Sequence, residues 1–89
     1  MTDLEAANEH SEHNRPEVLA SEQCGCFCCG AIFEPTAIWN WLDTTDPHTA
    51  FCPQCGMNAV IGSASGLPIT IPFLQEMNTR WFDGTFIDA

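Results

Sequence analysis

Two short cysteine-rich stretches decide the fold of this chain: residues 24–30 read CGCFCCG, and residues 51–56 read FCPQCG. Only two cysteine pairs have two residues between them: Cys26/Cys29 and Cys52/Cys55. Two C-x-x-C turns that face each other place four sulfur atoms at the corners of a tetrahedron, which is the coordination of structural zinc. The spacing therefore predicts one metal site with these four cysteines as its ligands.

A glycine follows the second cysteine of each pair, at Gly30 and Gly56. In such a tight turn the backbone N–H groups point at a thiolate sulfur. The residue after the second cysteine takes a positive φ, which glycine adopts without steric penalty. Pro53 also fixes φ at the first step of the second turn. These residues support the prediction of two metal-binding turns, called knuckles below.

Cys24 and Cys28 are left over by this assignment. Cys28 lies between two ligands in the first knuckle, so we expect its side chain to point away from the metal. Cys24 is expected to pack as a small hydrophobic residue. A redox role for the pair is the alternative, although their separation of four is not the C-x-x-C spacing of thiol oxidoreductases.

Two disulfides are the alternative to a metal, and they would need an oxidising compartment. Residues 1–18 (MTDLEAANEHSEHNRPEV) show neither the basic start nor the apolar run of a signal peptide. No stretch approaches the ~20 apolar residues that span a bilayer. We therefore expect a protein of the cytoplasm without membrane contact. In that reducing compartment clustered cysteines more often bind metal than form disulfides.

The charge balance is strongly acidic, with 12 acidic residues, two arginines, no lysine and a net charge of −10. Binding of nucleic acid relies on Lys and Arg to neutralise phosphates, so the composition argues against nucleic acid as a direct ligand. A basic protein is the partner that this charge predicts, because opposite charge speeds association. The alternative is that the acidity only maintains solubility.

A change in composition at Cys24 predicts two parts of the chain. Residues 1–23 are acidic and poor in large aliphatic side chains, and are expected to form a disordered tail. Residues 24–89 are expected to form one zinc-ribbon domain with a four-cysteine site. Its predicted fold class is a small α+β domain stapled by metal, with two zinc knuckles, a helix inserted between them and a C-terminal helix.

The 22 residues between the two cysteine pairs slightly exceed the roughly 15 to 20 of a simple ribbon, and an inserted helix accounts for the surplus. Pro35 suits the first helical position. From there Ile38, Trp41 and Leu42 would share one helical face. Trp39 would lie about 100° from Ile38 and is expected to be exposed.

We expect short strands on either side of the cysteine pairs, at residues 31–33, 49–51 and 58–62. The last helix is expected to begin after Thr70, which can cap it, and to end near Gly84. In this helix Phe73, Met77 and Trp81 form an apolar stripe at positions i, i+4 and i+8.

The pattern CFCCGAIFEP followed by FCPQCG resembles the paired knuckles of rubredoxin-like domains and zinc ribbons. A rubredoxin resemblance implies that the same four cysteines hold one iron ion and carry one electron. The spacing between the knuckles is shorter than in typical rubredoxins. The chain also continues into a strand and a helix that an electron carrier does not need.

A second resemblance covers residues 26–82. The stretches CFCCGAIFEPTAIWNWLD, TAFCPQCGMNAVIGSASGLPIT and FLQEMNTRWF resemble a group of small bacterial cytosolic zinc-ribbon proteins of uncharacterised function. In that group the phrase VIGxxSGxPIT and an aromatic helix end recur in the same order. This resemblance implies a structural zinc site and a non-catalytic domain. Residues 39–41 (WNW) depart from the group, where the first helix has a polar middle.

The leading hypothesis for function is a structural-zinc binding module that recognises a protein partner, as a regulator, an inhibitor or an immunity-type protein. Trp39 is the candidate partner-binding residue, because tryptophan is enriched in interface hot spots. The alternative is a rubredoxin-like one-electron carrier with iron in the same site. Visible absorption separates the two, because zinc has a filled d shell.

An enzyme is the weakest hypothesis. A catalytic zinc keeps one coordination position open, whereas four cysteines close it. His48, close to Asp46, is the only histidine outside residues 1–23, and such a pair alone is a weak catalytic signal. No nucleophile motif or phosphate-binding glycine loop is present. We therefore predict a non-catalytic protein.

Overall fold

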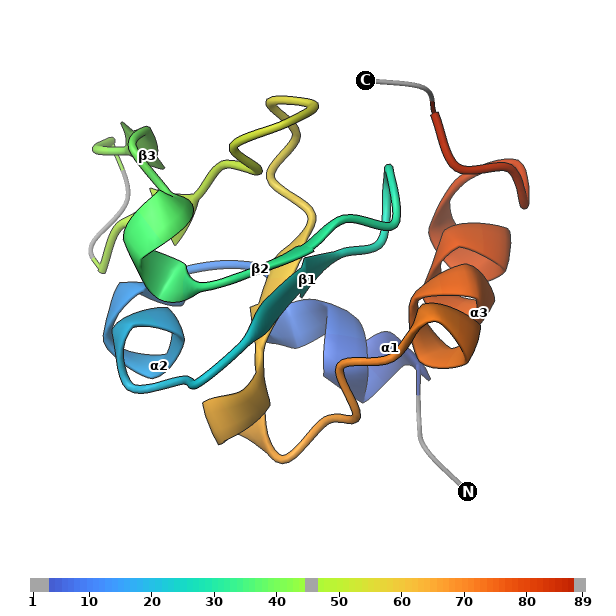
Figure 1. The fold of residues 1–89 in the computed structure, drawn as a ribbon, viewed down its shortest axis with the longest axis horizontal. Coiled ribbons are helices and arrows are strands. Elements are labelled where there is room, and N and C mark those ends of the chain that lie inside the picture. The colour runs from blue at the N-terminus through green and yellow to red at the C-terminus, as the bar shows by residue number, and fades with distance from the viewer. Residues whose placement is uncertain (1–3, 45–46, 88–89) are drawn as a thin grey trace.

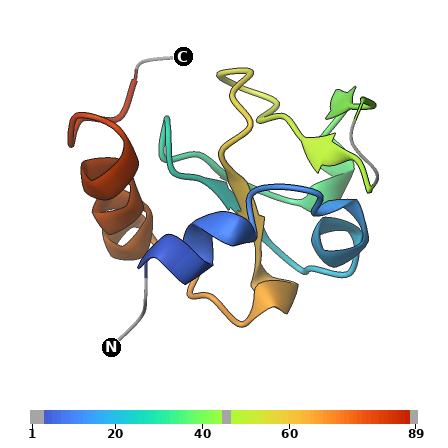
Figure 2. The ribbon, with the colours of Figure 1, turned by 180° about the vertical axis from the view of Figure 1, so that it is seen from behind.

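Two small antiparallel sheets and three α-helices make up the computed structural model, which describes residues 4–44 and 47–87. With η for 3-10 helices, the elements are α1 (Leu4–Glu9), α2 (Arg15–Leu19), β1 (Cys24–Cys26), β2 (Ile32–Phe33), η1 (Pro35–Ala37), β3 (Trp41–Leu42), β4 (Thr49–Ala50), β5 (Val60–Gly62), η2 (Ser63–Ser65) and α3 (Ile71–Trp81). The central strands separate α2 on one side from α3 on the other (Figure 1). The view from behind shows α1 between α3 and the central strands (Figure 2).

The larger sheet has the order β2-β1-β5, with β1 in the centre. Cys24 of β1 lies opposite Phe33 on one side and Gly62 on the other, and Cys26 lies opposite Val60. The second sheet pairs β3 with β4. The predicted strands at residues 31–33, 49–51 and 58–62 are confirmed within two residues, whereas β1 was not predicted. The first cysteine turn follows β1, and the second follows β4.

The core lies between the larger sheet and the helices. Val60 and Ile61 of β5 are buried, as are Leu74 and Met77 of α3. A side chain at Gly25 would place its Cβ only 3.0 Å from Leu74, so glycine allows α3 to approach β1 closely. This close packing holds α3 against the strand that leads into the first cysteine turn.

The C-terminal helix agrees with its prediction. Thr70 caps α3, and its side chain accepts a hydrogen bond from the Phe73 N–H at 3.4 Å. Phe73 and Met77 are buried and Trp81 is half-buried, as the apolar stripe predicted. None of the helices in the described ranges is long and apolar enough to cross a membrane, and α3, the longest, has 11 residues.

The N-terminal segment differs from the disordered tail that composition predicts. Residues 4–23 form α1 and α2, which pack against α3 and the strands; residues 1–3 of the predicted tail lie outside the described residues. Val18 is fully buried, and Ala7 is also part of the core. Two apolar side chains and several buried polar ones hold this segment, although it contains few large aliphatic residues.

Asn14 ties the N-terminal segment to both sheets. It is 2% exposed, and its Nδ2 donates to the carbonyl oxygens of His10 at 2.9 Å and Val60 at 2.8 Å. Its Oδ1 accepts a hydrogen bond from the Ala50 N–H at 3.0 Å. One buried side chain therefore joins the end of α1 to β4 and β5.

Replacing Asn14 with alanine is expected to lower the free energy of unfolding by about 3 kcal/mol, because buried backbone groups of Val60 and Ala50 lose their partner. Urea denaturation of the metal-loaded protein measures this change. Asn40→Ala, at an exposed position, is the control and should stay within about 0.5 kcal/mol of the parent. A loss below about 1 kcal/mol for Asn14→Ala would contradict this role.

The prediction of a helix over residues 35–42 is wrong beyond its first turn, which is the 3-10 helix η1. After the single 3-10 turn of η1, Ile38 is extended (φ −76°, ψ 120°), and Trp41 and Leu42 form β3. The segment IWNWL favours a strand because its aromatic and β-branched side chains suit a pleated surface, and β4 supplies the pairing partner. Alternation along the extended chain buries Ile38 and leaves Trp39 77% exposed. The predicted exposure of Trp39 is thus confirmed in an extended segment.

Candidate metal centre

The two knuckles lie at the same end of the molecule and bring four sulfur atoms together. In Figure 1 they are the loop between β1 and β2 and the loop between β4 and β5. The sulfurs all lie within 4.8 Å of one another and belong to the predicted set: Cys26, Cys29, Cys52 and Cys55. Cys28 is not part of this group. The sequence therefore predicted the complete sulfur cluster.

The distances between the sulfurs fit a metal and not disulfides. The Sγ atoms of Cys26 and Cys55 are 3.6 Å apart, and those of Cys29 and Cys52 are 3.7 Å apart. A tetrahedron with Zn–S bonds of about 2.3 Å has sulfurs about 3.8 Å apart, whereas a disulfide needs about 2.05 Å. All six cysteines are free. The alternative of two disulfides does not agree with this geometry.

The two knuckles share one backbone structure. The N–H of Gly30 donates to the Cys26 carbonyl at 2.8 Å, and the N–H of Gly56 donates to the Cys52 carbonyl at 3.0 Å. In both turns the N–H of the first cysteine donates to the carbonyl five residues later at 2.9 Å. Both glycines have φ of 79°, the left-handed conformation that their positions predicted. The local sequence thus forms the same turn twice.

Backbone N–H groups point at the sulfur of the first cysteine in each knuckle. The Cys28 N–H lies 3.4 Å from Cys26 Sγ, and the Gln54 N–H lies 3.3 Å from Cys52 Sγ. The Cys55 N–H adds a contact of 3.5 Å to Cys52 Sγ. These donors stabilise the thiolate form, which is the form that binds metal.

Burial raises the pKa of the Cys26, Cys29 and Cys55 thiols, and that of Cys29 reaches about 11. Burial also acts to raise the pKa of Cys52, but N–H donors from Cys55 and Gln54 outweigh it and lower that pKa below its ordinary value. A divalent ion must therefore displace protons from most of the cluster when it binds. Four sulfur donors suit zinc or iron and not magnesium or calcium. The residues present could hold such an ion.

The cluster has a buried side and an accessible side. Cys26 and Cys52, the first cysteine of each knuckle, are buried in the core. Cys29 and Cys55, the second cysteines, are half-buried. Any bound ion would therefore sit close to the surface, behind one sulfur from each knuckle.

The remaining two cysteines are both buried. Cys24 lies in β1 at the centre of the sheet, where burial raises its pKa to about 11, and its predicted role as a small hydrophobic residue is confirmed. Cys28 is 2% exposed, and burial raises its pKa while a hydrogen bond with Cys55 acts in the opposite sense. It is not part of the four-sulfur group, in agreement with the expectation that it is not a ligand.

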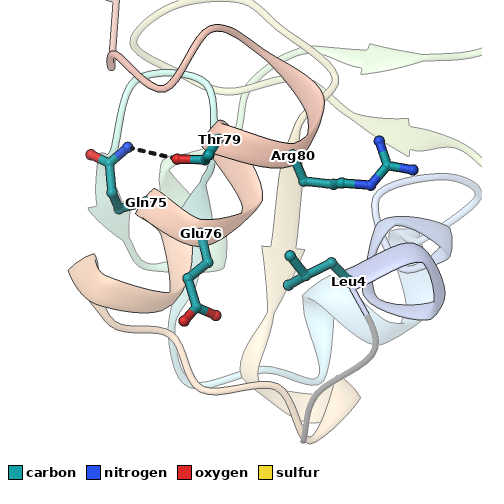
Figure 3. Close-up of a pocket in the computed structure, with 5 residues that line it drawn as sticks. All are labelled: Leu4, Gln75, Glu76, Thr79 and Arg80. Carbon is teal, nitrogen blue, oxygen red and sulfur yellow. Dashed lines mark hydrogen bonds between the residues drawn. The ribbon is translucent and has the colours of Figure 1, made fainter.

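The other candidate residues lie outside the sulfur cluster. Trp39 lies just before β3, and its indole ring is largely exposed. His48 interacts with Arg15, with 3.2 Å between His48 Nδ1 and the guanidinium, and its predicted neighbour Asp46 lies outside the described residues. A cavity of about 410 Å³ lies between α1 and α3 (Figure 3). Its lining includes none of the cluster cysteines: Leu4, Gln75, Glu76, Thr79 and Arg80.

Sequence reasoning missed Asn78 of α3. Its side chain is fully buried, and its Nδ2 donates to the carbonyl oxygens of Phe27 at 2.9 Å and Cys28 at 3.3 Å, inside the first knuckle. The only signal in the sequence is an asparagine next to Met77 on the apolar side of the helix. Such a signal identifies a buried amide but not its partner.

The two knuckle glycines allow a matched test of how each turn is packed. Gly30→Ala and Gly56→Ala introduce the same left-handed alanine, at a cost of about 1–2 kcal/mol in the free energy of unfolding. At Gly30 the new Cβ would also lie 2.8 Å from the Phe86 ring, whereas at Gly56 nothing lies within 4 Å. We expect Gly30→Ala to cost about 1 kcal/mol more, because Phe86 must move. Equal melting temperatures for the two metal-loaded variants would contradict this asymmetry.

No protein-family model matches the chain, and neither a curated protein nor a solved structure matches it. The resemblance to zinc ribbons therefore rests on the residues of this chain alone. The structure establishes a small α+β fold in which four cysteines could hold one metal ion.

Proposed function

We propose that this chain is a metal-stapled binding module in which one structural zinc ion maintains the fold and an acidic surface bearing Trp39 recognises a basic protein. The cluster of four sulfurs within 4.8 Å of one another, with two pairs 3.6 and 3.7 Å apart, is the observation that carries the proposal. In this proposal the ligands are Cys26, Cys29, Cys52 and Cys55. Four sulfurs fill the coordination shell of zinc, so the ion has a structural and not a catalytic role.

The surface of the described residues supports a basic partner. Arg15 lies over the Trp41 ring at 4.8 Å, and Arg80 lies over the Trp81 ring and binds Glu5 at 2.9 Å. Both arginines of the chain thus make intramolecular contacts. Acidic residues outnumber the arginines 12 to two. An acidic surface attracts a basic protein and raises its association rate.

Trp39 is the proposed anchor on this surface. It is 77% exposed, which is unusual for so large an apolar side chain in a small protein. Buried tryptophans at the centre of an interface contribute much of the binding energy. A regulator, inhibitor or immunity-type protein that blocks a basic enzyme would use such a combination of charge and one aromatic anchor.

Affinity capture from the native host at low salt tests partner recognition. The parent protein should retain one basic protein in stoichiometric amount. Trp39→Ala should weaken its binding by about 30-fold or more, as expected for a hot spot worth about 2 kcal/mol. Ile71→Ala, an exposed apolar position on α3, is the control and should bind like the parent. Absence of a stoichiometric partner, or equal binding by Trp39→Ala, would count against the proposal.

A rubredoxin-like one-electron carrier is the second candidate, with iron held by the same cysteines. The N–H groups that point at the sulfurs and the half-buried positions of Cys29 and Cys55 favour it, because hydrogen bonds and solvent exposure set the reduction potential of iron–thiolate sites. Metal analysis with a visible spectrum of protein from its own host decides between the two. Zinc gives a colourless protein, and iron bound to four thiolates absorbs visible light.

The proposal also includes a setting for the protein. We place it among small bacterial zinc-ribbon proteins of the cytoplasm, on the two knuckles and the VIGxxSGxPIT phrase. The reducing cytoplasm keeps cysteines available for metal. The six free thiols are consistent with this setting.

A further inference from the structure

The first knuckle is held from outside by the C-terminal part of the chain. Asn78 of α3 donates to the carbonyl oxygens of Phe27 and Cys28, the two residues between Cys26 and Cys29. The Ile87 N–H donates to the same Cys28 carbonyl at 3.0 Å. Figures 1 and 2 both show this turn facing α3 and the segment that follows it.

Aromatic packing strengthens this contact. The Phe27 and Phe82 rings lie 5.9 Å apart, and Phe86 covers Gly30. At the second knuckle, by contrast, a Cβ built on Gly56 meets no atom within 4 Å. The two halves of the sulfur cluster therefore have the same backbone turn but different support.

Each hydrogen bond from Asn78 ends on the carbonyl oxygen of a peptide group whose N–H lies in the first knuckle. The Phe27 carbonyl and the Cys28 N–H belong to one peptide group, and the Cys28 carbonyl and the Cys29 N–H belong to the next. The first of these N–H groups, that of Cys28, donates to Cys26 Sγ at 3.4 Å. A planar peptide that accepts a bond at its oxygen is fixed in orientation, and its N–H becomes a stronger donor.

We infer that Asn78 is a positioning residue for the metal site: through the Phe27–Cys28 peptide group it orients and strengthens the N–H donor to the Cys26 sulfur, and its second bond fixes the next peptide group, so that the first knuckle is the preorganised half of the site. The inference rests on the proposed metal role of the four cysteines. Residues that orient metal ligands by hydrogen bonds, without touching the metal, typically contribute about 10–100-fold to metal affinity. The Asn78 amide is suited to this role because it is fully buried and both of its hydrogen bonds end in the turn.

Asn78→Leu tests the inference, because leucine has a similar size and no donor. Asn14→Leu is the matched control: Asn14 is also buried and bonds two carbonyls, but neither lies in a knuckle. The zinc-loaded proteins are mixed with a chromophoric chelator, and the rate of zinc release is recorded. We expect release from Asn78→Leu to be at least about 10-fold faster than from Asn14→Leu, which loses a comparable buried amide but no bond to a knuckle.

Cobalt substitution gives a readout that lost stability alone would not move. Weaker N–H donors leave the sulfur richer in electrons, so the sulfur-to-cobalt charge-transfer band of Asn78→Leu should shift to longer wavelength. The band of Asn14→Leu should match that of the parent. Equal release rates and equal bands for the two variants would overturn the inference.

Amide hydrogen exchange in the zinc-loaded parent keeps the inference testable if Asn78→Leu does not fold. The N–H group of Cys28 should exchange at least about 10-fold more slowly than the equivalent N–H of Gln54, because in the described part of the chain side-chain bonds to the turn carbonyls are found at the first knuckle. Equal exchange rates would overturn the inference and leave the metal role intact. A parent protein that binds no metal would instead overturn the proposed function and the inference together.

Discussion

Removal of the metal is expected to unfold the α+β domain. The 89 residues bury only a small core, so a metal staple would supply a large share of the stability. Structural zinc contributes about 10–16 kcal/mol in small domains, which equals or exceeds the total stability of about 5–15 kcal/mol that is usual for a folded protein. Far-UV circular dichroism and tryptophan fluorescence, recorded before and after a strong chelator, measure the effect.

Re-addition of one equivalent of zinc is the control and should restore both signals. The half-buried Trp41 and Trp81 should become solvated in the metal-free protein, which shifts their emission to longer wavelength. A metal-free protein with unchanged spectra and an unchanged melting temperature would contradict the role of the ion as a staple.

The second large effect is expected from a single ligand. Cys26→Ser should weaken zinc binding by more than about 100-fold, or roughly 3 kcal/mol, because it removes one of four sulfurs that share the binding energy. Cys26 is also buried, so water cannot easily reach the vacant ligand position. The charge at the site would therefore be left without compensation. Zinc affinity is measured by competition with a chelator of known strength.

Cys28→Ser is the matched control, two residues away in the same knuckle. Cys28 is buried but is not part of the four-sulfur group. The variant should keep one zinc per chain, with affinity within about 10-fold of the parent. Loss of the metal in Cys28→Ser, or full retention in Cys26→Ser, would show that the ligand set is different.

The four-cysteine cluster was predictable because a C-x-x-C-G turn is a local structure. Each knuckle is closed by bonds between residues at most five positions apart, such as Gly30 to Cys26, so a short stretch of chain specifies it. The capped helix α3 is equally local, since Thr70 and the apolar stripe lie within one element. Local patterns of this kind can be recognised without knowledge of the rest of the fold.

The segment between the knuckles was not predictable for the opposite reason. Five residues, 38–42, are too few for hydrophobic spacing to distinguish a helix from a strand. The choice depends on β4, which pairs with β3 from a later part of the chain. Trp39 was predicted to be exposed because either structure turns it away from Ile38.

The buried asparagines were missed because their partners are distant in sequence. Asn14 bonds to residues 36 and 46 positions away, and Asn78 bonds to residues 50 and 51 positions away. Composition treats both as polar surface residues, and for Asn14 this led to the prediction of a disordered tail. A buried amide is recognisable only when the chain that surrounds it is known.

X-ray absorption at the metal edge, on protein purified from its own host, tests the central claim most directly. The account predicts one ion per chain with four sulfur neighbours at about 2.3 Å and no nitrogen or oxygen neighbour. Fewer than four sulfurs, a histidine or carboxylate in the shell, or a chain without metal whose cysteines are paired as disulfides would contradict it.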